Sequence, residues 1–335
     1  MKPKKKFSLG PNDRLVLVTG GAGYKGSTLC RELLFHGYRV RVVDNLMYGG
    51  RSLAGLINHP QFEFVNGDVT NTKDIDKSLN EVTDIIHLAA IVGDKPCERD
   101  PQRSIEVNYK ATQSLAEKAK KRNVNHFLFA STCSNYGVAD TSKPISEDGE
   151  LNPVSLYAET KIDCERYLSA QANHNGFCPT MFRFSTAFGV SGRTRFDLTV
   201  NSFTYEALRD QRLIVFAEES WRPFIHVLDM ARIYCKFLEL PKEQVSGQIF
   251  NAGWNEQNFT KRDIIEQIKS VIGDFEVDYI NTVEDKRSYR VDFTKIEQIL
   301  DFAPVMSVRD GVKELVKAIE SGLLTEQDFE KNRLK

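Results

Sequence analysis

The 335-residue sequence lacks the features that define several large protein classes. No apolar stretch approaches the ~18 residues that a membrane span requires, and no apolar signal region follows the basic start. The six cysteines contain no CxxC pair, and the six histidines form no HExxH or similar ligand cluster. These absences predict a cytoplasmic protein with free thiols, no metal site and no membrane association.

Excess charge of one sign is also missing. The chain carries 45 basic and 46 acidic residues, a net charge of −1, so no overall positive field would hold a nucleic acid. The lysine-rich start at Lys2–Lys6 is a local exception, for which a disordered, solvated tail is favoured over a nucleic-acid arm. What the chain does have is length, and 41% hydrophobic residues, enough for one large α/β domain or two closely joined ones.

The most informative stretch is LVLVTGGAGYKG, near the start of the chain. The apolar run Leu15–Val18 predicts a strand buried on both faces. The turn after it carries Gly20, Gly23 and Gly26, and residues 27–34 have the pattern of a helix. Such a turn can bring its backbone against a pyrophosphate at the positive end of the helix dipole, which predicts a dinucleotide site.

A carboxylate at the end of the next predicted strand strengthens this interpretation. The strand 39–43 ends in Asp44, near the spacing expected for an acid that accepts hydrogen bonds from the adenosine ribose hydroxyls. The alternative is a turn or cap carboxylate ahead of Asn45. A carboxylate here repels a 2′-phosphate, so NAD is favoured over NADP, although Arg39 and Arg41 weaken that preference.

The alternation of strand-like and helix-like segments predicts a doubly wound parallel α/β sheet, in which ligands bind beyond the carboxyl ends of the strands. Asp68, Leu88–Ala90 and Thr132 all follow predicted strands and therefore belong to the same sheet edge as the glycine loop. The expected organisation is a basic tail at 1–13, a dinucleotide-binding Rossmann domain at 14–185 to which parts of 222–255 return, a smaller α/β substrate-binding domain at 186–325, and a tail at 326–335.

Tyr157 and Lys161 lie four residues apart on a predicted helix and therefore share a face. The non-functional alternative is a tyrosine and a lysine that share an exposed helix face. The position of the pair favours a functional role, because it follows the predicted strand that ends at Ser131 and Thr132 in a nucleotide-binding fold. A neighbouring ammonium and an oxidised nicotinamide favour the phenolate of Tyr157. The phenolate can take the proton of a substrate hydroxyl while hydride leaves the same carbon, with Thr132 orienting the hydroxyl.

With these motifs the sequence resembles the extended short-chain dehydrogenase/reductase family, in its nucleotide-sugar epimerase/dehydratase branch. The resemblance extends over roughly residues 14–320. It depends on the glycine loop, Asp44-Asn45, Asp68-Val69, HLAA at 87–90, Asn108 in VNYKAT, STCSNYG at 131–137, the YxxxK pair and WRPFIHVLDMA at 221–231.

The resemblance implies tightly held NAD and a substrate in which a sugar is linked to a nucleoside diphosphate (UDP, GDP, dTDP or CDP). It also implies a homodimer through a four-helix bundle formed by helices at about 103–121 and 155–172. The implied cofactor residues are Gly20, Gly23, Tyr24, Lys25, Gly26, Asp44, Asn45, Asp68, Val69, Leu88, Ala89, Ala90, Asn108, Ser131, Tyr157 and Lys161. The implied substrate residues are Thr132, Thr186, Arg195, Leu198, Arg222 and Arg287, and arginines suit a diphosphate because their fork matches phosphate oxygens.

The two residues that follow Thr132 reduce the number of reactions that the family resemblance allows. The 4,6-dehydratases and related decarboxylases of the family carry a glutamate there, whereas this chain has Cys133 and Ser134. Neither group replaces a carboxylic acid for expelling water, so oxidation to a 4-keto sugar is expected, followed by re-reduction (4-epimerase) or release (4-dehydrogenase). The segment Arg195–Leu198, with the residues after it, is similar to a subgroup that includes GDP-heptose 4-dehydrogenases. A dehydratase, a 3/5-epimerase using Cys133, and a non-catalytic NAD-sensing relative remain alternatives.

Lys25 departs from the family, which normally has an apolar residue at this position of the glycine loop. A cation at a helix start opposes the helix dipole unless an anion is near, so Lys25 is a candidate to supplement the pyrophosphate site. The alternative is that its side chain points to solvent.

Overall fold

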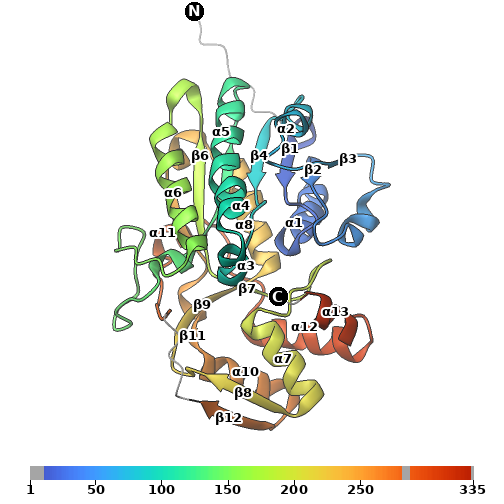
Figure 1. The fold of residues 1–335 in the computed structure, drawn as a ribbon, viewed down its shortest axis with the longest axis vertical. Coiled ribbons are helices and arrows are strands. Elements are labelled where there is room, and N and C mark those ends of the chain that lie inside the picture. The colour runs from blue at the N-terminus through green and yellow to red at the C-terminus, as the bar shows by residue number, and fades with distance from the viewer. Residues whose placement is uncertain (1–10, 281–286, 333–335) are drawn as a thin grey trace, which may run out of the picture.

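The structure, a computed structural model, describes residues 11–280 and 287–332. Two lobes share the chain: the upper lobe in Figure 1 holds a large sheet between layers of helices, and the lower lobe holds short strands and the helices α7, α10, α12 and α13. The lysine-rich start at residues 2–6 lies outside the described residues. Within the described ranges, no helix is both long enough and apolar enough to cross a membrane.

The large sheet confirms the predicted α/β doubly wound architecture. Its seven strands are all parallel, in the order β10-β6-β5-β4-β1-β2-β3. They are β1 (Leu15–Thr19), β2 (Arg39–Asp44), β3 (Phe62–Asn66), β4 (Asp84–His87), β5 (Phe127–Thr132), β6 (Pro179–Phe184) and β10 (Ile249–Ala252). The order reverses direction at β1, so the glycine loop that follows β1 sits at the switch point where such sheets bind ligands.

Helices cover both faces of this sheet and explain the near-continuous apolar strands. On one face α1 (Tyr24–Phe35) packs against α8 (Val227–Glu239), and their buried side chains share a core with Val16, Val18 and Phe182. The other face carries α2 (Thr72–Ser78), α5 (Ala111–Lys121) and α6 (Leu156–Gln171), which form a second core with Leu15, Leu17 and Phe127. The short helices α3 (Asp94–Arg99), α4 (Pro101–Ile105), α9 (Lys242–Val245) and α11 (Thr294–Glu297) complete this lobe.

The smaller lobe has its own hydrophobic core. It is built from α7 (Thr199–Asp210), β8 (Arg212–Phe216), α10 (Lys261–Ile272), β12 (Glu276–Ile280), α12 (Val308–Glu320) and α13 (Glu326–Asn332). A three-stranded sheet, β11 (Asn258–Thr260), β9 (Trp221–His226) and β7 (Thr186–Phe188), lies between this lobe and the large sheet. Capping boxes start α10 at Thr260 and α12 at Ser307, which satisfies backbone donors at both helix starts.

The helix that carries Tyr157 begins at Leu156, because the Ser155 hydroxyl caps it by accepting a hydrogen bond from Ala158 N at 3.4 Å. One boundary differs from the sequence-based expectation. Residues 326–332, expected within a tail, instead form α13. Its Phe329 is buried, with its ring centre 4.1 Å from that of Tyr205, so α13 closes the core of the smaller lobe.

Candidate active site

The glycine loop places no side chains over the first turn of helix α1, so the backbone there is accessible. A Cβ on Gly20, whose φ is +73°, would lie 2.8 Å from Ala89 N, and one on Gly26 would lie 2.6 Å from Gly21 Cα. Gly23 is the N-cap, no side chain caps the helix, and no acidic residue occupies the first turn. The free N–H groups and the dipole of α1 therefore remain available to an anion.

A single cavity runs from this loop along the carboxyl ends of the strands. Over β2 and β3 it is lined by polar groups, and over β4 and β5 it reaches Tyr157 and Lys161. Of the residues predicted to bind a cofactor or substrate, Gly20, Gly23, Tyr24, Lys25, Gly26, Asp44, Asn45, Asp68, Val69, Leu88, Ala89, Ala90, Ser131, Tyr157, Lys161 and Arg195 line this cavity.

Asp44 lies at the end of β2, facing the glycine loop. Its carboxylate accepts hydrogen bonds from Ala22 N at 3.0 Å and from Leu46 N at 2.8 Å. Burial raises its pKa, although these two backbone donors and Arg193 oppose the rise. An ionised carboxylate can accept about four hydrogen bonds, so two acceptor sites remain for ribose hydroxyls.

We expect the variant Asp44→Asn to bind NAD about tenfold more weakly, because a hydrogen bond to a charged acceptor is worth about 1.5–3 kcal/mol. The amide keeps one acceptor oxygen for the loop, so the protein should still fold. Its preference for NAD over NADP should narrow as well, because the charge that repels a 2′-phosphate is gone. Calorimetric titration with both cofactors measures this, with the exposed Asp13→Asn as the control; unchanged affinities would contradict the ribose role.

A charged cluster lies at the end of the cavity over β3. Two of its members were predicted from the sequence and the third was not. Arg103 Nη2 contacts Asp68 Oδ2 at 2.7 Å, and Asn45 Nδ2 donates to the same oxygen at 3.2 Å. The predicted residues Asn45 and Asp68 are thus brought together. Arg103 joins them from α4, 35 positions along the chain from Asp68, a proximity with no local sequence signal.

Tyr157 and Lys161 meet at the opposite end of the cavity. The Lys161 ammonium lies 5.9 Å from the centre of the Tyr157 ring and 4.5 Å from that of Phe129. Burial lowers the pKa of Lys161 to about 8. Burial raises the pKa of Tyr157, and the cation that opposes this rise is Arg195. Arg195, predicted from sequence as a substrate residue, therefore also faces the phenol.

The predicted residue Thr132 lies beside the cavity and not in its lining. It ends β5, and its hydroxyl accepts a hydrogen bond from Ser134 N at 3.1 Å, which caps the turn Cys133–Tyr136. Its neighbour Ser131 does line the cavity and donates to Glu165 Oε1. A hydroxyl that accepts one hydrogen bond keeps its hydrogen to donate, so Thr132 can still contact a substrate oxygen.

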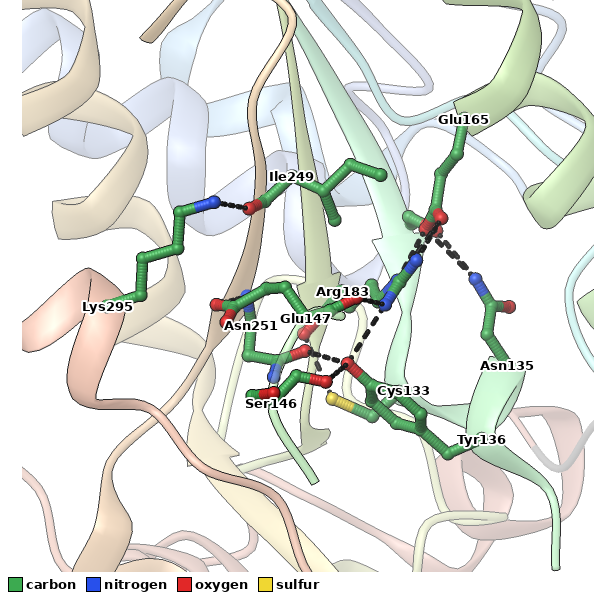
Figure 2. Close-up of polar contacts among 11 residues, drawn as sticks. Cys133, Asn135, Tyr136, Ser146, Glu147, Glu165, Arg183, Ile249, Asn251 and Lys295 are labelled. Atoms are coloured by element: carbon green, nitrogen blue, oxygen red, sulfur yellow. Dashed lines mark hydrogen bonds and ion pairs between the residues drawn. The ribbon is translucent and has the colours of Figure 1, made fainter. Parts of the chain in front are cut away.

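A buried polar network lies behind this turn, as Figure 2 shows. Arg183 of β6 pairs with Glu165 of α6, with Nη2 to Oε2 at 2.8 Å, and both residues are almost fully buried. Asn135 Nδ2 donates to the same carboxylate at 2.9 Å, and Arg183 Nη1 donates to Tyr136 Oη at 3.0 Å. Because Glu165 is one turn beyond Lys161 on α6, the network fixes the β5 turn against the helix that carries the tyrosine–lysine pair.

Several other predicted residues lie outside the cavity lining. Asn108 is buried behind it, where its side chain accepts from Ile91 N at 2.8 Å and donates to Ile91 O at 3.0 Å, and so holds the loop after β4. Arg222 donates to Trp221 O and Arg287 O, and Arg287 pairs with Asp94 at 3.1 Å. The remaining two are Thr186, which begins β7, and Leu198, which precedes α7.

Arg193 is a lining residue that the sequence interpretation missed. Its guanidinium carbon lies 3.9 Å from the centre of the Tyr48 ring, and its buried Nε has no hydrogen-bond partner among the described residues. Asp44 and Asp197 both attract it. A buried donor of this kind at the mouth of an anion-binding loop fits a ligand oxygen. The arginine pair Arg193 and Arg195 in one short loop was the available signal.

These features together fit a dinucleotide. The bare start of α1 and its glycine cradle suit the pyrophosphate, Asp44 suits the adenosine ribose, and the apolar run 88–92 leads to Tyr157 and Lys161. In the described parts of the chain, no group of three or more histidine, cysteine or acidic side chains could hold a metal ion.

Comparison with known sequences agrees with this geometry. The profile of the NAD dependent epimerase/dehydratase family matches residues 16–253. The chain belongs to this family. As a family member it uses NAD as its cofactor.

Individual relatives of the chain are enzymes that act on nucleotide-linked sugars. It is 29% identical to UDP-glucose 4-epimerase of Bacillus subtilis over 277 residues, which is 76% of this chain and 80% of the relative. It is 28% identical to UDP-glucuronic acid decarboxylase 1 of Xenopus tropicalis over 323 residues, 94% and 74% of the two chains. The crystal structure of UDP-glucuronic acid 4-epimerase from Bacillus cereus, in complex with UDP-glucuronic acid and NAD, superposes with a TM-score of 0.81 at 28% identity, covering 92% of this chain and 99% of that one. The narrower resemblance to GDP-heptose 4-dehydrogenases is not confirmed by these relatives.

Proposed function

We propose that this epimerase-family protein oxidises C4 of a nucleoside-diphosphate sugar to a 4-keto species and acts as a 4-epimerase or 4-dehydrogenase. The observation that carries the proposal is one continuous cavity in which the glycine loop and Asp44 lie at one end and Tyr157 and Lys161 at the other. The relatives named above support the substrate class, because their names specify UDP-linked sugars.

In this proposal Tyr157 is the base and takes the proton of the C4 hydroxyl. NAD, when bound, supplies the acceptor for the hydride that leaves the same carbon. Lys161 and Arg195 stabilise the phenolate of Tyr157, and Thr132 donates its hydroxyl hydrogen to the developing oxygen charge. Returning the hydride to the other face of the ketone gives the C4 epimer, and releasing the ketone gives a dehydrogenase.

The environment of Cys133 argues against the alternatives that use it. Its thiol is buried, donates to Arg183 O at 3.0 Å and does not line the cavity. Burial also raises its pKa above the ordinary range of a thiol. A group in this setting packs and does not exchange protons with a sugar, so neither 3/5-epimerisation nor expulsion of water is favoured.

A homodimer is part of the proposal. Helices α5 and α6 lie side by side on one face of the large sheet (Figure 1). Tyr167 Oη donates to Glu117 Oε1 at 2.7 Å and Lys120 Nζ donates to Gln171 Oε1 at 2.8 Å, which fixes the two helices as one unit. Two such units would form a four-helix bundle. Light scattering of the purified protein should give twice the chain mass; a monomer at micromolar concentration would contradict it.

The deciding experiment is incubation of the protein with a panel of UDP-, GDP-, dTDP- and CDP-linked sugars. Products are identified by mass and NMR while near-ultraviolet absorbance follows reduction of the bound cofactor. An isomer with inverted C4, or a ketone lighter by two hydrogens, would support the proposal and separate its two forms. A product lighter by one water or by carbon dioxide, or the absence of any product from every sugar, would contradict it.

A further inference from the structure

Lys25 is a cation on the wall of the cavity that the reaction proposed above does not use. It is the second residue of α1, where its own helix dipole disfavours a positive charge. Its side chain is half-buried and lines the cavity, and its ammonium lies 5.5 Å from the centre of the Phe184 ring. The side chain therefore neither points to bulk solvent nor folds back toward Asp44.

The strand order shows which end of the cavity this ammonium occupies. The glycine loop follows β1, with β2 and β3 on one side and β4, β5 and β6 on the other. The adenosine end, at Asp44 and Asp68, is over β2 and β3. Phe184 ends β6, so Lys25 reaches in the opposite direction, into the half of the cavity that contains Tyr157 and Lys161.

Among the residues that the structure describes, the groups around this ammonium are cationic or neutral. Lys161 of α6 and Arg195 of the loop before α7 both repel it, and the Cys133 thiol is its other titratable neighbour. Asp197 is already engaged by Arg195, with Arg195 Nη2 to Asp197 Oδ2 at 2.5 Å. Burial together with Arg195 and Lys161 lowers the pKa of Lys25 to about 7, so the side chain changes charge near neutral pH.

We propose that Lys25 is a positioning charge at the nicotinamide end of the cavity, which favours reduced over oxidised cofactor and takes up a proton when the cofactor is reduced. The physical reason is that an oxidised nicotinamide ring carries a positive charge and the reduced ring carries none. An ammonium at the same end of the cavity repels the oxidised ring and does not repel the reduced ring. Lys25 therefore holds its proton more tightly in the reduced complex than in the oxidised one.

The charge balance follows from this difference. In the proposed oxidation the sugar carbon gives up a hydride and its hydroxyl gives a proton to Tyr157. The hydride neutralises the positive charge of the nicotinamide ring, and the fraction of Lys25 that was neutral in the oxidised complex takes up a proton from solvent. The consequence for the sugar rests on the proposed function. The equilibrium on the enzyme between NAD with the sugar alcohol and NADH with the ketone would be displaced toward the ketone, which favours release of a keto product over its re-reduction.

The experiment compares affinities and needs no turnover. The dissociation constants of NAD and NADH are measured calorimetrically on the full chain, and their ratio gives the effect of the protein on the redox equilibrium. Below pH 7 the ratio Kd(NAD)/Kd(NADH) should be about tenfold higher than in Lys25→Met, which corresponds to one pKa unit of coupling. That tenfold change equals about 30 mV for a two-electron couple.

Three further variants make the result specific. In Lys25→Arg the contribution of this position to the ratio should persist above pH 7, because the arginine stays charged. Arg31→Met removes an exposed cation from the same helix and should change nothing. Tyr157 and Lys161 also titrate at this end of the cavity. In Tyr157→Phe/Lys161→Met, which removes both groups, the ratio should still fall between about pH 6 and about pH 9, and adding Lys25→Met should abolish this dependence.

An unchanged ratio in Lys25→Met, or an equal change in Arg31→Met, would overturn the inference. If Lys25→Met does not fold, Lys25→Ile tests the same point, because the family normally has an apolar residue there. Failure of every sugar in the panel would contradict the proposed reaction but would leave this ratio measurable, so the two failures are distinguishable.

Discussion

Replacing Tyr157 with phenylalanine should lower the rate of sugar oxidation by about 10²- to 10⁴-fold, the range expected when a positioned general base is removed. The phenol lines the cavity beside Lys161 and Arg195, and deletion of one oxygen leaves the ring and its packing in place. NAD affinity should therefore change little. The loss should appear in kcat, because the contact with the hydroxyl proton matters most in the transition state.

The pH profile gives the sign of the tyrosine effect. Burial raises the pKa of Tyr157, so the phenolate is scarce at neutral pH and the rate of oxidation should rise as the pH increases. Lys161→Met should move this rise to higher pH, because it removes the ammonium 5.9 Å from the centre of the Tyr157 ring, which favours the phenolate in the proposed reaction. Single-turnover reduction of bound NAD across the pH range measures both effects.

A control for Tyr157 exists on the same helix. Tyr167 of α6 donates its hydroxyl to Glu117 and faces α5, away from the cavity. Tyr167→Phe should keep the wild-type rate. Equal losses in the two variants would mean that the helix, and not the phenol of Tyr157, was affected, and a fully active Tyr157→Phe would contradict the proposed chemistry.

Glu165→Gln should lower the free energy of unfolding by about 3–5 kcal/mol, the usual result of removing one partner of a buried ion pair. The carboxylate accepts hydrogen bonds from Arg183 and Asn135 (Figure 2). It also accepts one from Ser131, and all three donors are buried. Glutamine keeps the shape but leaves the Arg183 guanidinium uncompensated in the interior. Urea denaturation followed by circular dichroism measures the loss.

Two comparisons make the Glu165 result interpretable. The exposed pair Arg209–Asp210, with a 2.6 Å contact, should lose less than about 1 kcal/mol in Asp210→Asn, because solvent screens it. The double variant Glu165→Gln/Arg183→Met should be more stable than the single one, since the unpaired charge is gone. If Glu165→Gln lowers the free energy of unfolding no more than Asp210→Asn does, the buried network does not stabilise the turn after β5, contrary to what its geometry indicates.

The parts of the molecule that could be predicted from sequence are those whose signals are local. The apolar run, the glycine spacing and Asp44 lie within one strand–turn–helix–strand unit, which the structure forms as β1, α1 and β2. The YxxxK pair shares a helix face because of helix geometry, and the structure brings it to the cavity that the glycine loop begins. In each case the contacts are fixed by neighbours in sequence.

The parts that could not be predicted depend on contacts between distant segments. Arg103 reaches Asp68 from another helix, and Arg193 reaches Tyr48 across the two lobes. Resemblance assigned a role to Asn108, but the structure shows its side chain holding Ile91 and not lining the cavity. No periodic apolar pattern surrounds Phe329, so the sequence does not predict a packed helix there. The structure shows that α13 packs because the Phe329 ring stacks on that of Tyr205, more than 100 residues earlier in the chain.

The hydroxyl of Tyr24, within the glycine loop, has a consequence for motion of the molecule. It donates to Gly189 O at 2.8 Å, in the segment that leads from β7 into the smaller lobe. Parting the lobes to exchange a ligand must break this buried contact, which costs about 0.5–1.5 kcal/mol. Any separation of the two lobes would therefore also pull on Tyr24, and so on the start of the helix whose glycine loop faces the dinucleotide.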